Sequence, residues 1–400
     1  MNKGVEIARG KTKVLYEMPG QPDVLIAQGL DAITAGDGAR RDEIPGKGRV
    51  AMKTTSRIFR LLNRCGVPTH YLSGGEDDDD NEMLVRRCTM IPLEVVVRGV
   101  AAGSLVTRKP GIQRGSVIVP RMIEFFAKDD ANHDPLIEPD TIVRNRIATP
   151  PEIGTMGELA RIVFEILAHA WRRHETLLVD LKIEFGRLAS GEQRGALVIA
   201  DVIDNDAWRI WPQGREDLML DKQVYRNLTE VTPAALARVS AAYDEVSELV
   251  GSFPQMRPGI VVLVADGPQL VPSFEPVARA LQLFGLPTMQ RVVSSTLTPG
   301  FVLQLVQQLD ASFPRVVYVS ASGGDLSSIL EAATQAPVFE VRGADPERLA
   351  LAVAKVFALD DTVLFGRTML VQANSRSAVL QADAAASAPP DANQSGMAVA

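Results

Sequence analysis

The chain has 400 residues with a formal net charge of −7, and 46% of its residues are hydrophobic. A chain of this length is expected to form two or three domains, each long enough to bury its own core. The hydrophobic fraction excludes a disordered chain. The acidic balance argues against non-specific binding of nucleic acid, which needs a basic surface, but it leaves room for a local basic pocket that binds a phosphate.

The cysteines, the N-terminus and the longest apolar segments indicate the cellular compartment and the kinds of metal site that are disfavoured. The two cysteines, Cys65 and Cys88, cannot form a disulfide framework and disfavour a zinc site. The N-terminus has no apolar signal core, and no segment reaches the roughly 18 apolar residues of a membrane span. We therefore expect a protein of the reducing cytoplasm with no membrane partner. The chain has 4 histidines, and none follows His174.

Residues 1–120 contain short β-type runs separated by glycine and proline, a pattern typical of hairpins in an antiparallel sheet. The runs cover residues 14–16, 24–27, 83–85, 94–97 and 117–119. One helix is predicted over residues 49–65, and it should end at the stop signal formed by Gly66 and Pro68.

Residues 155–250 favour long helices and strands. An amphipathic helix is predicted over residues 155–176 and another helix over residues 233–250, with strands at 177–185 and 196–202 between them. Residues 251–258, which contain glycine and proline, indicate a linker. We therefore expect a first domain that covers residues 1–250.

Beyond the linker, apolar strands alternate with helices, which is typical of a doubly wound parallel sheet. The expected strands cover residues 260–265, 290–293, 315–319 and 338–341, and the expected helices cover 277–284, 301–309, 326–334 and 346–358. Residues 259–381 are thus predicted to form a second α/β domain. Residues 382–400 are rich in alanine, serine and proline and are expected to form a disordered tail.

Two lysines near the N-terminus suit a polyphosphate. Lys11 and Lys13 follow Gly10 and enter a predicted strand, where residues two apart share one face. Taken alone the pattern is weak, because alternating lysines on an edge strand more often serve solubility. The Gly46-Lys47-Gly48 sequence is similarly weak by itself.

A second motif lies in residues 90–104. Arg98 ends a predicted strand, and the turn of small residues that follows, with Gly103, exposes the Ser104 hydroxyl and backbone N–H groups. Arginine, serine and free N–H groups together suit a phosphate. The ordinary alternative is a strand-end arginine in a surface ion pair.

A polar loop over residues 125–134 combines Lys128 with Asp129 and Asp130. Such a loop can hold a magnesium–nucleotide complex, with the lysine on a phosphate and an aspartate on the metal or its waters. The alternative is a charged surface turn.

Carboxylates also occur in and after two neighbouring strands. Alternation in residues 178–186 places Asp180, Lys182 and Glu184 on one face of a strand and apolar side chains on the other. Asp201 ends the next strand. Carboxylates that converge from adjacent strand ends are a common way to bind Mg²⁺.

Together these segments resemble the SAICAR synthetase family (phosphoribosylaminoimidazole-succinocarboxamide synthase) over residues 1–250. Residues 90–104 and 178–186 match the two signature patterns of that family at every defined position. The other motifs follow in the order of the family, at residues 10–16, 128–135, 201–211 and 221–226. Residues 201–211 look like those of the animal-type bifunctional enzyme, in which an AIR carboxylase domain follows on the same chain.

The resemblance implies an ATP-dependent ligase that joins aspartate to the carboxylate of carboxyaminoimidazole ribotide (CAIR) through an acyl phosphate. It implies ATP and Mg²⁺ as cofactors, and a β-rich lobe and an α/β lobe that clasp ATP, akin to ATP-grasp enzymes. The residues that it assigns are Gly10, Lys11 and Lys13 for ATP; Glu184 and Asp201 for Mg²⁺; Lys128, Asp129, Asp130 and Lys182 for the reacting centre; and Arg98, Gly103, Ser104, Asp206, Arg209, Lys222 and Arg226 for the substrates.

Residues 259–381 resemble the AIR carboxylase domain in strand–helix order and spacing but lack its catalytic motifs. The turn that binds phosphate in that family is replaced here by residues 265–269, in which Pro268 removes an N–H donor and Asp266 adds negative charge. Residues 294–297 lack the histidine of the family, and residues 322–326 lack its arginine. We expect a domain that is inactive as a carboxylase and serves assembly, so that the chain forms a homo-oligomer.

Three other functions stay open at this point. A specialised paralogue would join an amino acid to another heterocyclic carboxylate, as in nucleoside-antibiotic biosynthesis. A non-catalytic scaffold would pair with an intact enzyme, but Lys11, Glu184 and Asp201 argue against it because a scaffold has no need of them. A fully bifunctional enzyme would need the missing histidine.

Overall fold

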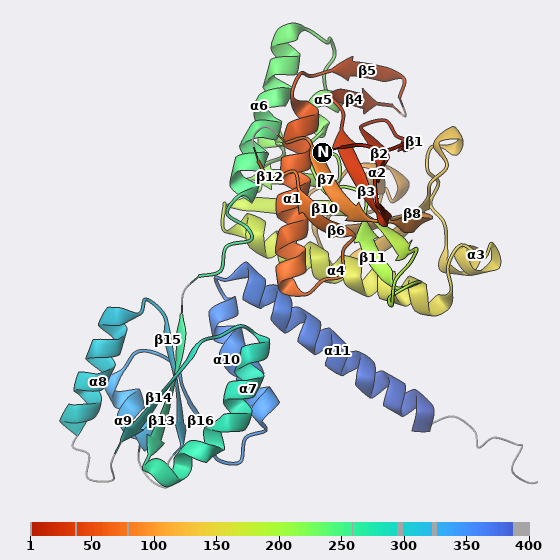
Figure 1. Cartoon of the computed structure of the whole chain (residues 1–400). Coiled ribbons are helices and arrows are strands. Elements are labelled where there is room, and N and C mark those ends of the chain that lie inside the picture. The colour runs from red at the N-terminus through yellow and green to blue at the C-terminus, as the bar shows by residue number, and fades with distance from the viewer. Residues whose placement is uncertain are drawn as a thin grey trace, which may run out of the picture.

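The computed structural model describes residues 2–36, 38–77, 80–257, 259–293, 299–321 and 326–386. Two β-sheets with flanking helices form the N-terminal part, and one parallel sheet forms the centre of the C-terminal part (Figure 1). Within these ranges, no helix combines the length and the apolar character that a membrane crossing requires.

The first sheet joins neighbouring strands in the order β1-β2-β3-β7-β6, all antiparallel. Its strands are β1 (Glu6–Arg9), β2 (Lys13–Met18), β3 (Gln21–Gly29), β6 (Tyr71–Gly74) and β7 (Glu82–Arg86). A separate antiparallel hairpin consists of β4 (Ala32–Ala35) and β5 (Arg40–Glu43). The antiparallel arrangement predicted from the glycine and proline spacing is confirmed.

The second sheet has the order β11-β10-β8-β9, and β12 pairs with β10 as well. Its strands are β8 (Cys88–Val100), β9 (Val117–Ala127), β10 (Thr176–Leu188), β11 (Leu197–Ala200) and β12 (Trp208–Pro212). All of these pairings are antiparallel. The two longest strands, β8 and β10, lie side by side and carry five of the charged residues discussed below: Glu94, Arg98, Asp180, Lys182 and Glu184.

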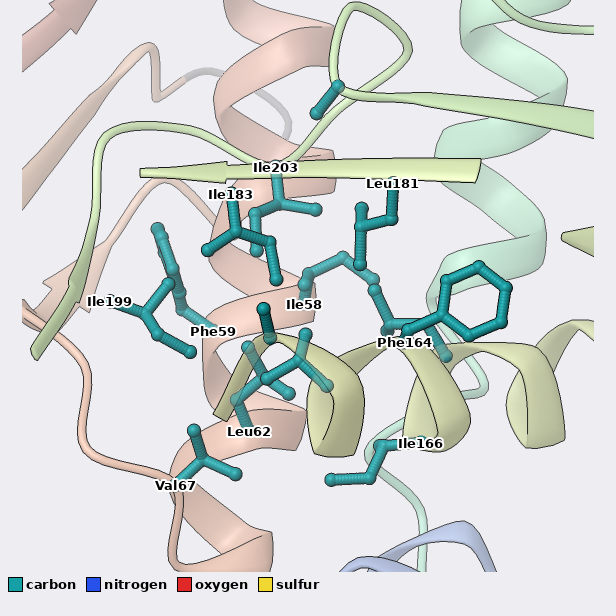
Figure 2. Close-up of a cluster of buried hydrophobic side chains, with 14 of the residues drawn as sticks. Ile58, Phe59, Leu62, Val67, Phe164, Ile166, Leu181, Ile183, Ile199 and Ile203 are labelled. Atoms are coloured by element: carbon teal, nitrogen blue, oxygen red, sulfur yellow. The ribbon is translucent and has the colours of Figure 1, made fainter. Parts of the chain in front are cut away.

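The main hydrophobic core fills the space between β10 and two long helices (Figure 2). Leu181 and Ile183 of β10 pack against α1 and α4, where Ile58, Leu62 and Phe164 are almost fully buried. The helices of this part are α1 (Lys47–Cys65), α2 (Ser104–Arg108), α3 (Pro139–Arg144), α4 (Pro150–Arg172), α5 (Gln223–Arg226) and α6 (Pro233–Val250).

Helix boundaries follow from local capping. Helix α1 ends as predicted at Gly66, whose φ of 94° places it in the left-handed region where glycine is favoured. Helix α4 begins at Pro150, earlier than the predicted residue 155, because Thr149 and Glu152 form a capping box that satisfies the first backbone N–H groups. The start of α4 is therefore encoded as a cap rather than as hydrophobic periodicity.

The C-terminal sheet is parallel throughout, in the order β14-β13-β15-β16. Alternate residues of β13 pack to opposite sides: Val261 and Leu263 face one hydrophobic cluster, and Val262 and Val264 face another. Helices thus cover both faces, and the doubly wound arrangement is confirmed. The elements are β13 (Ile260–Asp266), β14 (Thr288–Val293), β15 (Val316–Ala321), β16 (Val338–Glu340), α7 (Glu275–Leu283), α8 (Pro299–Ser312), α9 (Leu326–Ala333) and α10 (Pro346–Ala358).

The last helix, α11 (Thr362–Ala386), was not predicted. It extends into residues 382–386, where a disordered tail was expected, and residues 387–400 lie outside the described part of the chain. It packs against α10 and also against α1 and α4 of the N-terminal part (Figure 1). His169 of α4 stacks on Phe365 with ring centroids 4.4 Å apart, and its Nδ1 lies 3.0 Å from the Thr362 hydroxyl. A helix from the C-terminal part therefore completes the packing of the N-terminal part.

Candidate active site

A cavity of about 480 Å³ lies where β2 meets β10 and the segments that follow β9 and β11. Most of the side chains that line it are charged, and both signs are present. The lining residues are Gly10, Lys11, Thr12, Lys13, Thr34, Ala35, Gly36, Glu94, Lys128, Asp134, Lys182, Glu184, Asp201, Val202, Asp206, Lys222 and Arg226. The structure thus brings together the residues assigned to ATP and to Mg²⁺, two of those assigned to the reacting centre, and three of those assigned to the substrates.

The pairing of β8 with β10 builds the floor of this cavity. Glu94 of β8 lies opposite Glu184 of β10, and Arg98 lies opposite Asp180. Because side chains alternate along a strand, Lys182 shares the face of Asp180 and Glu184, whereas the intervening apolar residues enter the core. The predicted alternation is confirmed.

Glu184 is held by two lysines. Lys128 Nζ donates to Glu184 Oε2 at 2.7 Å, and Lys182 Nζ lies 3.5 Å from Glu184 Oε1. Lys182 also donates to Glu94 Oε1 at 2.7 Å. Burial alone would raise the pKa of Glu184, but the ammonium groups of Lys182 and Lys128 hold that pKa below its ordinary value. Glu184 is therefore ionised at neutral pH, although it is almost fully buried.

Asp201 forms an ion pair with Lys13 across the cavity. Its backbone has a φ of 67°, a left-handed conformation that is uncommon for residues other than glycine and is often found at functional sites. Burial lowers the pKa of Lys13 to about 8, although the negative charge of Glu184 opposes this effect. The turn after β11 thus places a carboxylate against the lysine that the family resemblance assigns to ATP.

Glu184 and Asp201 suit a magnesium ion. Across the described ranges, no group of three or more His, Cys, Asp or Glu side chains is arranged to hold a metal by itself. Mg²⁺ is commonly held by one or two carboxylates together with waters and phosphate oxygens of a nucleotide. A pair of carboxylates beside lysines in a polar cavity fits that donor set.

A second charged network also lines the cavity. Lys222 Nζ donates to Asp206 Oδ2 at 2.7 Å, and the Tyr243 hydroxyl donates to Asp206 Oδ1. Burial alone would raise the pKa of Asp206, but the positive charges of Lys47 and Lys222 hold it well below its ordinary value. Lys47 is only 2% exposed and lies 5.1 Å from the centre of the Tyr243 ring. The weak Gly46-Lys47-Gly48 signal therefore marks a lysine behind the cavity wall.

Arg98, Gly103, Ser104 and Arg209 do not line the cavity but meet beside it. Arg98 donates to Glu124 Oε2 at 2.5 Å, and its other nitrogens lie 3.4 Å from Asp180 Oδ2 and 3.5 Å from Ser104 Oγ. Arg209 pairs with the same Asp180. We call this group the arginine cluster, and its members are Arg98, Ser104, Arg108, Glu124, Asp180 and Arg209.

Gly103 allows the Arg209 guanidinium to lie directly against the backbone of the turn before Ser104. Its φ is 54°, and a Cβ placed there would lie 2.5 to 2.8 Å from the guanidinium of Arg209. A side chain at position 103 would thus collide with the Arg209 guanidinium, and it would also be strained at this φ. Both effects favour glycine here.

The loop after β9 is arranged differently from the sequence expectation. Lys128 and Asp134 line the cavity, whereas the Asp129 side chain accepts a hydrogen bond from Asn132 Nδ2 at 2.7 Å within the loop. The backbone at Asp134 has a φ of 45°, which turns that residue toward the cavity wall. The side chain of Asp130 lies outside the described part of the structure.

Sequence reasoning did not single out Glu94, Asp134, Arg108, Glu124 and Tyr243 as members of these networks. Glu94 stands inside a matched motif, so its charge within an apolar run was an available signal. Asp134 also stands inside a matched motif, at residues 128–135. Arg108, Glu124 and Tyr243 come from α2, β9 and α6, and no local sequence pattern indicates that they belong to these networks.

Comparison with known proteins identifies relatives of the N-terminal part and of nearly the whole chain. The family model described as SAICAR synthetase matches residues 6–242. Phosphoribosylaminoimidazole-succinocarboxamide synthase of Roseiflexus castenholzii is 49% identical over 247 residues, which cover 62% of this chain and 96% of that protein.

Two animal proteins also match beyond the N-terminal part. The probable multifunctional protein ADE2 of Caenorhabditis elegans is 32% identical over 411 residues, covering 94% of this chain and 95% of that protein. The bifunctional phosphoribosylaminoimidazole carboxylase/phosphoribosylaminoimidazole succinocarboxamide synthetase of Drosophila melanogaster is 34% identical, covering 84% of this chain and 78% of that protein.

Among solved structures, a type-2 SAICAR synthetase in complex with ADP is similar with a TM-score of 0.54 and 33% identity. The similarity covers 61% of this chain and 97% of the other. The structure of phosphoribosylaminoimidazole-succinocarboxamide synthase from Ehrlichia chaffeensis matches with a TM-score of 0.56 and 30% identity, over 63% of this chain and all of the other.

Proposed function

This chain belongs to the SAICAR synthetase family of ATP-dependent carbon–nitrogen ligases, and on that basis we propose that it joins aspartate to the carboxylate of CAIR in purine biosynthesis. The products are SAICAR, ADP and phosphate. The observation that carries this proposal is the shared cavity in which Lys13 pairs with Asp201 and Lys128 pairs with Glu184.

The reaction needs activation of a poor electrophile, because an ionised carboxylate would have to lose oxide. A carboxylate oxygen of CAIR attacks the γ-phosphorus of ATP, the bond to the β-phosphate oxygen breaks, and ADP leaves. The amine nitrogen of aspartate then attacks the acyl carbon, the bond to phosphate breaks, and the amine loses its proton. Positioning and charge neutralisation supply most of the catalysis in such phosphoryl transfers.

The charged residues of the cavity suit these two steps. Lys11 and Lys13 lie along the ATP phosphates behind Gly10, and Glu184 and Asp201 would hold Mg²⁺, which neutralises phosphate charge when it is bound. In the proposal, Lys128, Asp129, Asp130 and Lys182 line the reacting centre, where the two lysines stabilise negative charge. The lowered pKa of Glu184 supports its assignment to Mg²⁺, since only an ionised carboxylate binds a metal well.

The substrates are assigned to the flanking networks. The arginine cluster, with Arg98, Gly103, Ser104 and Arg209, takes the phosphate of the nucleotide substrate. Asp206, Lys222 and Arg226 also line the cavity, and in the proposal Lys222 and Arg226 bind substrate carboxylates.

For the C-terminal part, we propose a degenerate AIR carboxylase-like domain over residues 259–381 that follows the ligase domain and a linker. Its role is assembly into a homo-oligomer. The match of the Drosophila bifunctional protein to most of this chain supports the fusion. Asp266 at the end of β13 and Pro268 two residues later support the loss of a phosphate site. Residues 294–297 and 322–325, which carry the other two departures, lie outside the described part of the structure.

One assay tests the ligase. The purified chain is mixed with ATP, Mg²⁺, aspartate and CAIR, and both ADP and SAICAR are measured. Glu184→Gln should abolish turnover, whereas Glu216→Gln, which removes a surface carboxylate paired with Arg114, should leave it intact. If the chain turns over another azole carboxylate but not CAIR, CAIR is not its substrate. An unchanged rate for Glu184→Gln would refute the assignment of Glu184 to the metal.

A second assay tests the C-terminal domain. The chain is supplied with aminoimidazole ribotide and CO₂, and CAIR is measured. We expect no conversion, because residues 294–297 provide no imidazole. Formation of CAIR would show that this domain is a working carboxylase.

A further inference from the structure

Arg108 belongs to the arginine cluster, yet no sequence motif assigned it a role. It ends α2, one turn after Ser104, and its Nη1 donates to Ser104 Oγ at 3.0 Å. Its Nη2 donates to Glu124 Oε1 at 2.5 Å, and its guanidinium lies 5.3 Å from the centre of the Phe126 ring. Two residues of β9, Glu124 and Phe126, thus hold Arg108 in a defined position beside the serine hydroxyl.

Arg108 and Arg98 differ in accessibility. Arg98 is only 3% exposed, and its guanidinium is engaged with Glu124 and Asp180. The side chain of Arg108 is 29% exposed. Arg108 is therefore accessible to an incoming anion, whereas Arg98 is buried and pairs with the carboxylates of Glu124 and Asp180.

The charges of the arginine cluster do not cancel. Glu124 is shared between Arg98 and Arg108, and Asp180 is shared between Arg98 and Arg209. Three guanidinium groups thus face two carboxylates, and the ion pairs keep Glu124 ionised. One positive charge remains next to a serine hydroxyl, which is the combination that a phosphate monoester prefers.

We infer that Arg108 is a third arginine of the subsite that binds the phosphate of the nucleotide substrate and that it sets the affinity for that substrate. This inference rests on the proposed function, because it assumes a phosphorylated nucleotide as substrate. The Arg108 guanidinium donates to phosphate oxygens in place of its contacts with Ser104 and Glu124, and no bond of the substrate is made or broken there.

The test compares Arg108→Gln with Arg114→Gln. Arg114 lies six residues away, its side chain is 52% exposed, and it pairs with Glu216 outside the cluster, so it controls for the loss of one surface arginine. Arg108→Gln should raise the KM for the nucleotide roughly tenfold or more, with kcat within about twofold and the KM values for ATP and aspartate unchanged. Arg108→Lys should recover only part of the affinity, because lysine keeps the charge but not the planar fork.

A binding measurement separates this inference from the proposed function. Ribose 5-phosphate carries the phosphate without the imidazole carboxylate, and its dissociation constant can be measured by calorimetry whether or not the chain turns over CAIR. Weaker binding to Arg108→Gln than to Arg114→Gln supports the inference. Equal binding to both variants, or an unchanged nucleotide KM in Arg108→Gln, overturns it. Absence of turnover by the unmodified chain refutes only the proposed substrate.

Discussion

The contact between α11 and α1 allows a sharp test of how the two parts of the chain depend on each other. Gly366 of α11 is buried against Cys65, the last residue of α1. A Cβ at position 366 would lie 2.7 Å from Cys65 Cβ and 3.0 Å from Ile166 Cδ1. A rotation of the Cys65 side chain leaves its Cβ in place, so Gly366→Ala must push the helices apart.

The magnitude follows from the geometry. Carbon atoms pack best at roughly 3.5–4.0 Å, so the new methyl group is about 1 Å too close to Cys65. Overpacking of this kind costs about 1–3 kcal/mol. Alanine is also a better helix former than glycine, by about 1 kcal/mol, and this gain partly offsets the clash.

Gly154→Ala isolates the packing cost. Gly154 lies in α4, and a Cβ there meets no atom within 4 Å, so this variant gains helix propensity without a clash. Thermal unfolding of the full chain should show a lower Tm for Gly366→Ala than for Gly154→Ala. At about 2–4 °C for each kcal/mol in a domain of this size, the difference should be roughly 2–12 °C. If both variants unfold at the same temperature, α11 does not pack on α1 in solution.

Three further predictions concern the site and the pH dependence of stability. Gly103→Ala places a Cβ against the Arg209 guanidinium and should raise the KM for the nucleotide while the KM for ATP stays unchanged. If the variant and the unmodified chain have the same KM for the nucleotide, Arg209 does not bind the phosphate. Lys222→Met removes the cation 2.7 Å from Asp206 and should raise the KM for aspartate, and steady-state kinetics in which only the ATP KM changes would contradict that. Burial lowers the pKa of His70 from 6.5 to about 3, so the folded state disfavours its protonation and stability should fall as the pH drops from 6.5 toward 3. His70→Gln should reduce that slope by up to about 1.4 kcal/mol per pH unit in denaturant titrations, and an identical slope would show that His70 is not buried as a neutral ring.

Local patterns predicted much of the fold because they depend on backbone geometry alone. Residues 178–186 alternate with a period of two, so Lys182 and Glu184 share a face wherever the strand is placed. Helix α6 and helix α10 begin at Pro233 and Pro346 as predicted, since proline suits the first helical turn. The predicted start of α4 was wrong because hydrophobic periodicity begins only after the first turn, whereas the cap of Thr149 sets the boundary.

Helix α11 shows the limit of local patterns. It contacts α10 on one side and α1 and α4 on another, so its apolar residues are not confined to a single stripe, and no clear helical period marks it. Arg367 illustrates the reason: its Nε donates to the carbonyl oxygen of Arg64 at 2.9 Å, and its Nη1 donates to that of Phe284 at 2.5 Å. Contacts with both parts of the chain decide where this helix lies.

The sequence by itself determined the family of the protein, because the family motifs are short, local and rich in charged residues. Those motifs predict Lys13, Glu184 and Asp201 as site residues, and all three lie in one cavity. Only the tertiary structure decided which other charges complete the site. Arg108 and Glu124 meet because α2 folds back over β9, and pairing across 16 residues of intervening chain leaves no periodic signal in the sequence.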